Sequence, residues 1–465
     1  MNKLETFLES HFYPLIVCLL AFVAWASEGP YQFVNYGIVV LFLLTSAILM
    51  ALFKDTSYAI PLFLGLMFMV NIEKLGLKDI QKFSPIYILV FLVGVSLLVH
   101  LMRFRPKLKW GMLLPGFLLL AISYIIPIYY VTYSTTLFII SMIGFVYLAV
   151  YIFFGSTAQN KTDKILTYFF YASLIILAQL IFVEIKGYIS YDNTLSYIEK
   201  IKKGISSSWG NGDFGYGNMN DLIIFFTLMA SGQLYLILKH PTKYFLWVFP
   251  FLSILAVIFS GSRGGYIAWG LLLLMFFVLL VTFGTKKLVV TGSIVIGTVL
   301  ILLVAVPELL STLYDVFIQG GLDALDVFSS SRITLYKDAW KVFLENPIFG
   351  GGWMSNPDMG NPDRIQIYHS TIFHTLAISG LFGMFSLIVY VFSILVLFVK
   401  KMSLNVAILG SAWLVTMIHG LIDNTVHMII YTLITIIIFT SIEREENTVN
   451  NVVDLNINHI DYLTE

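Results

Sequence analysis

The sequence predicts an all-α polytopic membrane protein with twelve to fourteen transmembrane helices. Composition is the first reason: 58% of the 465 residues are hydrophobic, only 12% are charged, and the mean hydropathy is +0.88. The second reason is the recurrence of apolar runs near the length that crosses a hydrocarbon core of about 30 Å. The third is that polar residues concentrate in two long segments between such runs.

The expected spans follow one another along the chain, mostly with short polar connections. They cover residues 12–26, 31–53, 57–72, 84–102, 111–130, 135–155, 165–183, 221–238, 244–261, 265–284, 288–306, 376–399, 404–420 and 426–442. The first, third and last two runs are short or interrupted, which sets the lower end of the range. Pro14 interrupts the first run and no small-residue cleavage site follows it, so we expect this run to remain as a span.

The positions of Lys and Arg give an orientation. With the N-terminus in the cytoplasm, most of the Lys and Arg residues of the short connections fall on the cytoplasmic side. The long polar segments 184–220 and 307–370 then form two extracytoplasmic loops. We expect residues 1–442 to form a single transmembrane domain and residues 443–465 to form an acidic cytoplasmic tail.

Charge and cysteine content exclude several classes of function. The formal net charge is zero, which offers nothing to a nucleic-acid partner. The single cysteine, Cys18, cannot build a disulfide framework or a thiolate metal cluster. His369 and His374 are five residues apart, about 140° around a helix, so they do not share one face as metal ligands would. We therefore expect no metal site and no cofactor.

The first long loop ends in a glycine-rich run that contains Asn218 and Asn220. Glycines let the backbone approach a ligand closely, and the two amides supply neutral donors and acceptors, which favours a glycan-binding segment. A flexible turn leading into a helix capped by an Asn or by Asp221 explains the same residues equally well.

The second long loop is expected to contain a helix that lies in the outer membrane interface. Ser330 or Ser331 can cap a helix ending at Glu345, because Pro347 and three glycines follow. An apolar stripe at helical spacing, rich in aromatic side chains, is typical of such amphipathic helices. The stripe consists of Ile333, Tyr336, Trp340, Phe343 and Leu344.

Two arginines near the expected membrane surface are candidates for binding an anion. Arg263 stands alone among glycines between two apolar runs, and Arg332 stands in the first turn of the expected interfacial helix. An Arg at membrane depth costs about 2.5–3.5 kcal/mol, and its guanidinium can bind phosphate oxygens through two parallel hydrogen bonds. The alternatives are a snorkelling Arg at a short external turn and a plain surface charge on a helix.

Histidines supply the candidates for proton transfer. His369 lies where the second loop returns to the membrane, and an imidazole with a reference pKa near 6.5 suits general-base work. A hydrogen-bonded structural histidine is the alternative. Arg364 belongs to the same loop and can pair with Asp363.

Three ionisable residues, His419, Asp423 and His427, recur every four residues near the end of the chain. In a helix they would share one stripe, and ionisable residues within a membrane are functional candidates. In the alternative interpretation they form the outer turn between the last two spans, with Asp423 in the loop.

An ordered set of motifs resembles the superfamily of O-antigen ligases and Wzy-type O-antigen polymerases. Asn218 and Asn220 stand in a Gly-Asn-x-Asn segment, Arg263 in Ser-Gly-Ser-Arg-Gly, and Arg332 precedes Trp340 and Pro-Ile-Phe-Gly-Gly-Gly. His369 precedes Gly380 by the eleven residues that the family shows between its His and Gly. Ser370 stands where the family has Asn, and Asn211 near a place where it often has Arg.

This resemblance implies a metal-independent, inverting glycosyltransferase in the bacterial inner membrane that uses undecaprenyl-diphosphate-linked glycan at the outer leaflet. Arg263 and Arg332 would hold the diphosphate, and His369 would activate an acceptor hydroxyl. Asn218, Asn220, Arg364, His374, His419 and Asp423 would have supporting or glycan-binding roles. The implied partners are the lipid-linked oligosaccharide and the bilayer, with a flippase and a chain-length regulator as further candidates.

Three functions are compatible with these features. A polymerase would join one lipid-linked repeat unit to another, for O-antigen or capsule, and is the interpretation that we prefer. A ligase would move the glycan to lipid A-core or to protein. A lipid-linked oligosaccharide flippase is disfavoured, because transporters place ionisable groups near the midplane of two related halves and no such halves are found here.

Overall fold

The computed structural model describes residues 3–27, 32–69, 84–129, 135–159, 161–190, 219–260, 262–305, 332–353, 355 and 367–445. In this part of the chain all regular elements are helices and no strand occurs, which confirms the predicted all-α class. Six of the helices are long and apolar enough to cross a membrane, and six shorter apolar helices accompany them. The structure is thus that of a multi-pass membrane protein, whereas the number of twelve to fourteen spans stays a prediction.

Contacts between residues divide the chain into two compact units, formed by residues 1–107 with 157–312 and by residues 108–156 with 313–465. The helices of the first unit are α1 (Lys3–Glu9), α2 (Phe12–Ala26), α3 (Gln32–Leu52), η1 (Thr56–Ala59), α4 (Ile60–Met69), α6 (Ser84–Phe104), α10 (Thr162–Ser190), α12 (Met219–Met229), α13 (Ser231–Lys239), η4 (Tyr244–Trp247), α14 (Val248–Phe259), α15 (Arg263–Phe283) and α16 (Lys286–Ala305). Helices α1 and α2 together would make a seventh span, bent by 67°.

The core of the first unit combines close helix packing with a small polar network. Gly232 lets α13 approach α10, because a Cβ at this position would lie 2.2 Å from the backbone nitrogen of Phe170. The amide of Gln233 donates to the hydroxyls of Ser173 and Ser253, at 3.1 and 3.0 Å. Small residues and satisfied polar groups are how helices associate in lipid, where apolar surface alone gives little driving force.

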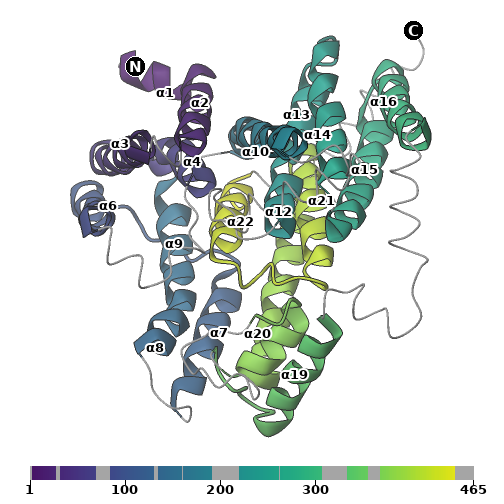
Figure 1. The fold of residues 1–465 in the computed structure, drawn as a ribbon. Helices are drawn as coiled ribbons and strands as arrows, with labels where there is room; N and C mark the ends of the chain where they lie inside the picture. Colours follow the sequence, from purple (N-terminus) through teal and green to yellow (C-terminus); the bar gives the residue numbers. More distant parts are fainter. Residues whose placement is uncertain are drawn as a thin grey trace. The chain divides into compact units, whose positions relative to one another are not determined.

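The second unit is built around one long helix, α20 (Thr371–Lys400), which packs against α7 and α19 (Figure 1). Its helices are α7 (Leu114–Ile125), η3 (Ile126–Tyr129), α8 (Thr135–Ser141), α9 (Ile143–Thr157), α19 (Arg332–Glu345), α20, α21 (Leu404–His419) and α22 (Ile429–Ile442). Gly116 brings α7 against α20, since a Cβ there would lie 2.7 Å from the Cα of Tyr390.

Helix α19 ends at Glu345, as its sequence predicted. Its packed face shares Phe343 with the predicted apolar stripe but otherwise differs from it: Ala339 and Val342 form a small core with Tyr368 and Ala377. Trp340 is 46% exposed, since it lies on another side of the helix. The exposed aromatic side chain remains compatible with an interfacial helix, and its place in a membrane stays a prediction.

Helix α20 is broken at Gly380, whose φ of 61° and ψ of −154° are not helical. A regular helix would bond the nitrogens of Leu381 and Phe382 to the carbonyls of Ala377 and Ile378, and the break removes both bonds. All four groups find partners in the segment that follows α19. Leu381 and Phe382 donate to the carbonyls of Pro347 and Ile348, at 2.8 and 2.9 Å, while Gly351 and Gly352 donate to those of Ala377 and Ile378, at 2.7 and 3.0 Å.

We call this set of four backbone hydrogen bonds, between residues 347–352 and 377–382, the glycine splice. It requires glycine where the two segments touch. Gly350 has a φ of 73°, and a Cβ there would lie 2.3 Å from the nitrogen of Ser379. A Cβ on Gly380 would lie 2.6 Å from the nitrogen of Gly350. A broken helix is tolerated at membrane depth only where its backbone groups are satisfied again by protein. The glycine motifs after α19 and within α20 therefore have a structural cause.

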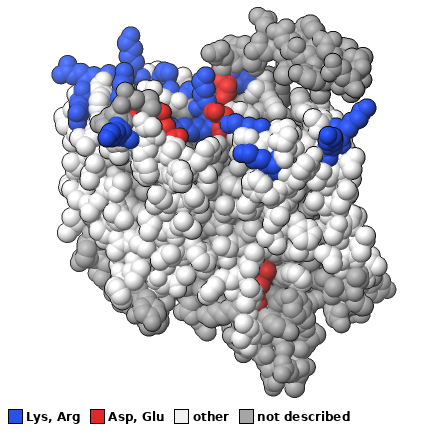
Figure 2. Space-filling view, turned by 90° about the horizontal axis from the view of Figure 1, so that it is seen from above, with Lys and Arg blue, Asp and Glu red and all other residues white. Residues whose placement is uncertain are grey.

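Charged side chains occupy a small part of the described surface. In the view of Figure 2 uncharged residues cover most of it, and Lys and Arg gather near its edge. Glu443, the first residue of the expected acidic tail, is instead part of the second unit: its carboxylate accepts from the nitrogen of Met112 at 2.7 Å and from the hydroxyl of Tyr151. Residues 446–465, and most of both expected long loops, lie outside the described residues.

Candidate functional site

His369 lies immediately before α20 in an unusual backbone conformation. Its φ is 44°, in the left-handed region that residues other than glycine seldom adopt. The next residue, Ser370, is the N-cap of α20, and its hydroxyl accepts from the nitrogen of Phe373. Ser and Asn are both good N-caps, so the Ser in place of the family's Asn preserves this function. Backbone strain of this kind is common at functional sites.

Helix α19 holds His369 from the other side. The hydroxyl of Tyr336 donates to the carbonyl of His369 at 3.0 Å, and the ring of Tyr336 stacks on Phe373 with 4.6 Å between centroids. These contacts fix the backbone of His369 while its side chain stays 34% exposed. A solvent-accessible imidazole on a rigid backbone is suited to bind and deprotonate a substrate hydroxyl.

The turn between α21 and α22 brings Asp423 to the same place. Helix α21 ends at His419 and α22 begins at Ile429, so the two histidines and the aspartate do not share a helical stripe. Thr371, the first residue of α20, donates its backbone N–H to the carbonyls of Gly420 and Asp423, at 2.8 and 3.0 Å. The turn thus supplies acceptors to the start of α20, and Asp423 is fixed beside His369.

The carboxylate of Asp423 joins the two predicted functional side chains. It accepts from Arg332 Nη2 at 3.4 Å and lies 3.3 Å from His369 Nδ1. The Asp423 side chain is 3% exposed and that of Arg332 is 16% exposed. Burial opposes ionisation, but the hydrogen bond and charge interaction with His369, together with the charges of His419 and Arg332, keep the pKa of Asp423 below its ordinary value.

An ionised Asp423 determines which nitrogen of His369 can act as a base. A carboxylate only accepts hydrogen bonds, so Nδ1 must carry the proton and donate it. In the neutral imidazole Nε2 is then left with a free lone pair. The same carboxylate stabilises the imidazolium that forms when Nε2 takes up a proton. The arrangement of Arg332, Asp423 and His369, which we call the polar junction, can hold an anion and move a proton.

Behind the polar junction lies a buried group of rings. His374 is fully buried, and its ring centroid lies 4.7 Å from that of His427 and 5.3 Å from that of Trp353. Thr375 donates its hydroxyl proton to the carbonyl of Thr371, so it must accept from His427 Nε2, at 2.9 Å. Neither ring nitrogen of His374 has a hydrogen-bond partner among the described residues, so packing alone holds this ring.

His427 is fully satisfied as a neutral ring. Its Nδ1 lies 3.0 Å from the hydroxyl of Tyr124, which donates to it when Nε2 carries the proton. His419 is also buried, 4% exposed, and lies inside the unit rather than on its surface.

The first unit contains a second polar arrangement, at the start of α15. The hydroxyl of Ser262 caps this helix by accepting from the nitrogen of Gly265 at 3.0 Å, and donates to Asn220 Oδ1 at 2.6 Å. Arg263 is the first residue of α15. A helix N-terminus favours anions, so this end of α15 combines the helix dipole with an arginine.

The structure links the predicted residues into two separate sets. Asn220 and Arg263 belong to the first unit, whereas Arg332, His369 and Asp423 belong to the second. Asn218 and Arg364 lie outside the described residues. Within the described part of the chain, no group of three or more His, Cys, Asp or Glu residues could hold a metal ion.

Comparison with known families places these residues in context. Residues 248–389 match the sequence model of a family described as O-antigen ligase. We call these residues the O-antigen ligase-type domain, after the family to which they are similar. The match supports the O-antigen ligase and polymerase superfamily, as the motifs indicated, and members of this superfamily are glycosyltransferase-like enzymes that act on lipid-linked glycans. No curated protein sequence matches the chain.

The matched residues of the O-antigen ligase-type domain contain Arg263, Arg332 and His369, but end before Asp423. The sequence pointed to Asp423 through its four-residue spacing from two histidines, which is a weak signal because a turn and a helix explain it equally. It did not reveal the hydrogen bond from Tyr336 to His369 or the one from Ser262 to Asn220, since both join residues distant in sequence.

Proposed function

We propose that this protein is a bacterial surface-polysaccharide polymerase. It transfers glycan from undecaprenyl diphosphate to another lipid-linked repeat unit at the outer leaflet of the inner membrane, with inversion and without a metal. The polar junction is the observation that carries the proposal: a partly exposed histidine is oriented by a buried carboxylate, and an arginine contacts the same carboxylate. The O-antigen ligase-type domain supports the same class of reaction.

The proposed reaction begins at the acceptor sugar. A hydroxyl of the acceptor donates its hydrogen bond to His369 Nε2, and its oxygen attacks the anomeric carbon of the donor from the side opposite the diphosphate. The new C–O bond forms as the bond to the diphosphate oxygen breaks, and the electron pair leaves with the polyprenyl diphosphate. His369 receives the proton, and Asp423 stabilises the resulting imidazolium.

The arginines are assigned to the leaving group in this proposal. Arg332 has further N–H donors besides the one given to Asp423, and Arg263 stands at a helix N-terminus. Cations fixed at the diphosphate stabilise charge that develops as it leaves, and such preorganised stabilisation is often the largest single contribution to catalysis. Positioning of two lipid-bound reactants in one membrane plane supplies a further part.

A ligase would use the same donor chemistry, and differs only in the acceptor. The domain match carries the description O-antigen ligase, which is the observation that favours this second candidate. Its acceptor would be lipid A-core or protein. The active site would face outside the cytoplasm in either case, with both termini inside, as the distribution of Lys and Arg favours.

The test is a transfer reaction with purified protein, lipid-diphosphate repeat units and a chelator. We expect a ladder of longer lipid-linked glycans with the wild type and none with His369→Ala or Arg263→Ala. His240→Ala, at the end of α13, is the control and should give the wild-type ladder. Transfer only to added lipid A-core or peptide would establish the ligase, and movement of labelled lipid across vesicles without any transfer would overturn both enzyme proposals.

A further inference from the structure

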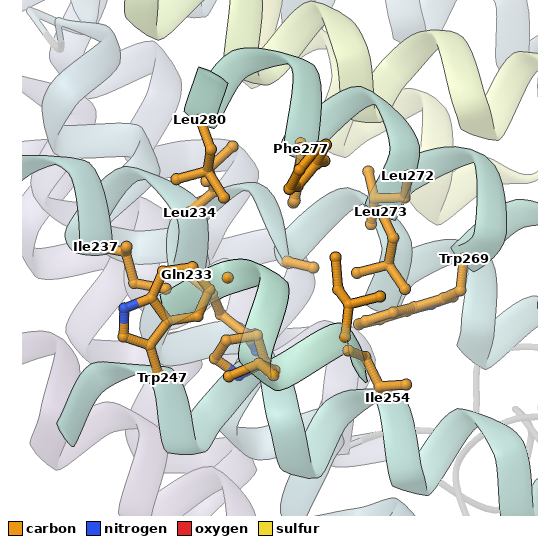
Figure 3. A pocket seen from close by; sticks show the side chains of 16 residues that line it. Gln233, Leu234, Ile237, Trp247, Ile254, Trp269, Leu272, Leu273, Phe277 and Leu280 are labelled. Carbon is orange, nitrogen blue, oxygen red and sulfur yellow. The ribbon is translucent and has the colours of Figure 1, made fainter. Parts of the chain in front are cut away.

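A small apolar space lies between α13, α14, α15 and α16 in the described part of the first unit. Figure 3 shows Trp247, Trp269 and Phe277 around it, and the polar side chain in its lining, Gln233, already donates to two serine hydroxyls. The space therefore offers no free polar group to a ligand. The ends of α3 and α6, in the same unit, do offer such groups.

Helices α3 and α6 end beside each other. Arg103, in the last turn of α6, donates from Nη1 to the carbonyl of Ala51, in the last turn of α3, at 3.3 Å. A cation at the last carbonyls of a helix is favourable, because these groups lack partners within the helix and carry the negative end of its dipole. A guanidinium has five N–H donors, and this bond uses one of them.

Three more cations follow these two helix ends. Lys54 comes two residues after α3, and Arg105 and Lys107 come directly after α6. All three are exposed, and among the described residues none of them has a side-chain hydrogen bond or an ion pair. At no more than about 3.6 Å per residue, their backbones lie within about 14 Å of the contact between the helices. We call Lys54, Arg103, Arg105 and Lys107 the basic patch.

The backbone at Arg105 is unusual. Its φ is 44°, in the left-handed region that a residue of this size seldom adopts and that is found at functional sites. Pro106 follows, and a proline disfavours the helical conformation in the residue before it, so α6 ends at Phe104. The positive-inside rule explains cations after a span, but it requires neither this conformation nor the meeting of two helix ends.

Exposed apolar side chains lie one turn back from the basic patch on both helices. Within each helix two of them are four residues apart, and such residues share one side of the helix. They are Ile48 and Leu52 on α3, and Leu98 and Met102 on α6. The two helix ends thus combine a group of cations with apolar surface, and α3 is a candidate membrane span.

We propose that the ends of α3 and α6 bind an anionic phospholipid of the membrane. Its phosphate lies at the basic patch, and its acyl chains lie along the exposed apolar sides of the two helices. Charge complementarity favours an anionic lipid over a zwitterionic one, and the apolar surface favours a lipid over free phosphate. In the proposed orientation this end of both helices faces the cytoplasmic leaflet, whose anionic lipids attract Lys and Arg beside a span.

Three substitutions remove charge from the basic patch and keep the contact between the helices. The test variant is Lys54→Gln/Arg105→Gln/Lys107→Gln, in which Arg103 still bonds to Ala51. Each Lys or Arg near an anionic lipid surface strengthens binding by about five-fold, so three should contribute on the order of 100-fold.

The matched control removes three exposed cations from other places in the same unit. Lys243 precedes η4, and Lys286 and Lys287 begin α16. Lys243→Gln/Lys286→Gln/Lys287→Gln therefore changes the net charge equally without touching the basic patch.

The experiment titrates the full-length protein with phosphatidylglycerol and with phosphatidylcholine and counts bound lipids by native mass spectrometry. We expect the wild type to prefer phosphatidylglycerol, and the test variant to bind it on the order of 100-fold more weakly with little change for phosphatidylcholine. The control variant should stay within about three-fold of the wild type for both lipids. Unfolding curves in phosphatidylcholine nanodiscs show whether each variant is folded. If the test variant is not, Arg105→Gln alone should weaken phosphatidylglycerol binding by about five-fold.

Three results would overturn the proposal. The wild type could bind the two lipids alike, or the test and control variants could lose affinity equally, which would show an effect of net charge alone. Glycerol phosphate, which has no acyl chains, could displace phosphatidylglycerol, which would show a site for free phosphate. The basic patch takes no part in glycan transfer, so the proposed function stands in each case.

Discussion

The start of α20 and its break at Gly380 are held by different kinds of contact. The polar junction at its start joins α19 and the turn after α21 through side chains, Arg332, His369 and Asp423. The glycine splice, about ten residues later, joins α20 to the segment that follows α19 through backbone groups, around Gly350 and Gly380. Both regions contain residues with a positive φ. At the glycine splice these residues are Gly350 and Gly380, and at the polar junction the residue is His369.

The contrast indicates that the polar junction serves the reaction and that the glycine splice serves the stability of the fold. Glycine adopts left-handed backbone without strain, so the splice has the residue type that costs least there. His369 adopts it at a cost, because its imidazole is needed at that point. Substitutions at the polar junction should therefore change the rate of transfer, and substitutions at the glycine splice should change stability.

The largest expected effect is at Asp423. Asp423→Asn keeps an oxygen that can accept from the nitrogen of Asn424, now 2.8 Å from the carboxylate, but removes the charge that orients His369. We expect kcat to fall by about 100-fold or more, with the fold retained. The measurement is the rate of glycan transfer beside a thermal unfolding curve.

Asp338→Asn is the matched control for this prediction. Asp338 lies on α19 and pairs with the exposed Lys341 at 3.6 Å, so its charge should not affect transfer. Equal losses of rate in the two variants would show that loss of any nearby negative charge slows transfer. They would contradict the specific role of Asp423 in orienting His369.

The next effect is at Gly380 and tests the other side of the comparison. Gly380→Ala forces a Cβ to within 2.6 Å of the backbone of Gly350 at a φ of 61°, and should destabilise the protein by about 3 kcal/mol. Gly297→Ala, where the added Cβ meets nothing, should not destabilise the protein and should stabilise α16 slightly, because alanine is the better helix former. Unfolding in detergent measures both, and an unchanged melting temperature in Gly380→Ala would contradict the structural role of the splice.

The smallest expected effect is at the cap between the two regions. Ser370→Ala should cost about 1 kcal/mol, because α20 loses the side chain that accepts from Phe373, whereas Ser370→Asn should cost close to nothing. Transfer should follow the same order, since a loosened start of α20 lets His369 leave its left-handed conformation. A Ser370→Asn enzyme slower than Ser370→Ala would show that the family's Asn has another function.

Much of the fold could be predicted because apolar length and composition are local properties. The all-α class and the helix that ends at Glu345 follow from hydropathy and capping residues, whereas the spacing around Asp423 left a turn and a helix both open. The packed face of α19 did not follow, because Ala339 and Val342 are small and contribute little to an apolar stripe that is weighted by aromatic residues. The face with small side chains allows α19 to pack closely, but the sequence alone does not show that Tyr368 and Ala377 pack against it.

The sequence by itself determined the membrane class, the candidate residues Arg263, Arg332 and His369, and the kind of chemistry that they can perform. Residue type and spacing along one chain carry that information. Only the tertiary structure decided that Asp423 orients His369, that Ser262 connects to Asn220, and that Gly350 packs against Gly380. Each of these contacts joins residues far apart in sequence, and a distance of 3 Å between such residues is set by helix packing rather than by local pattern.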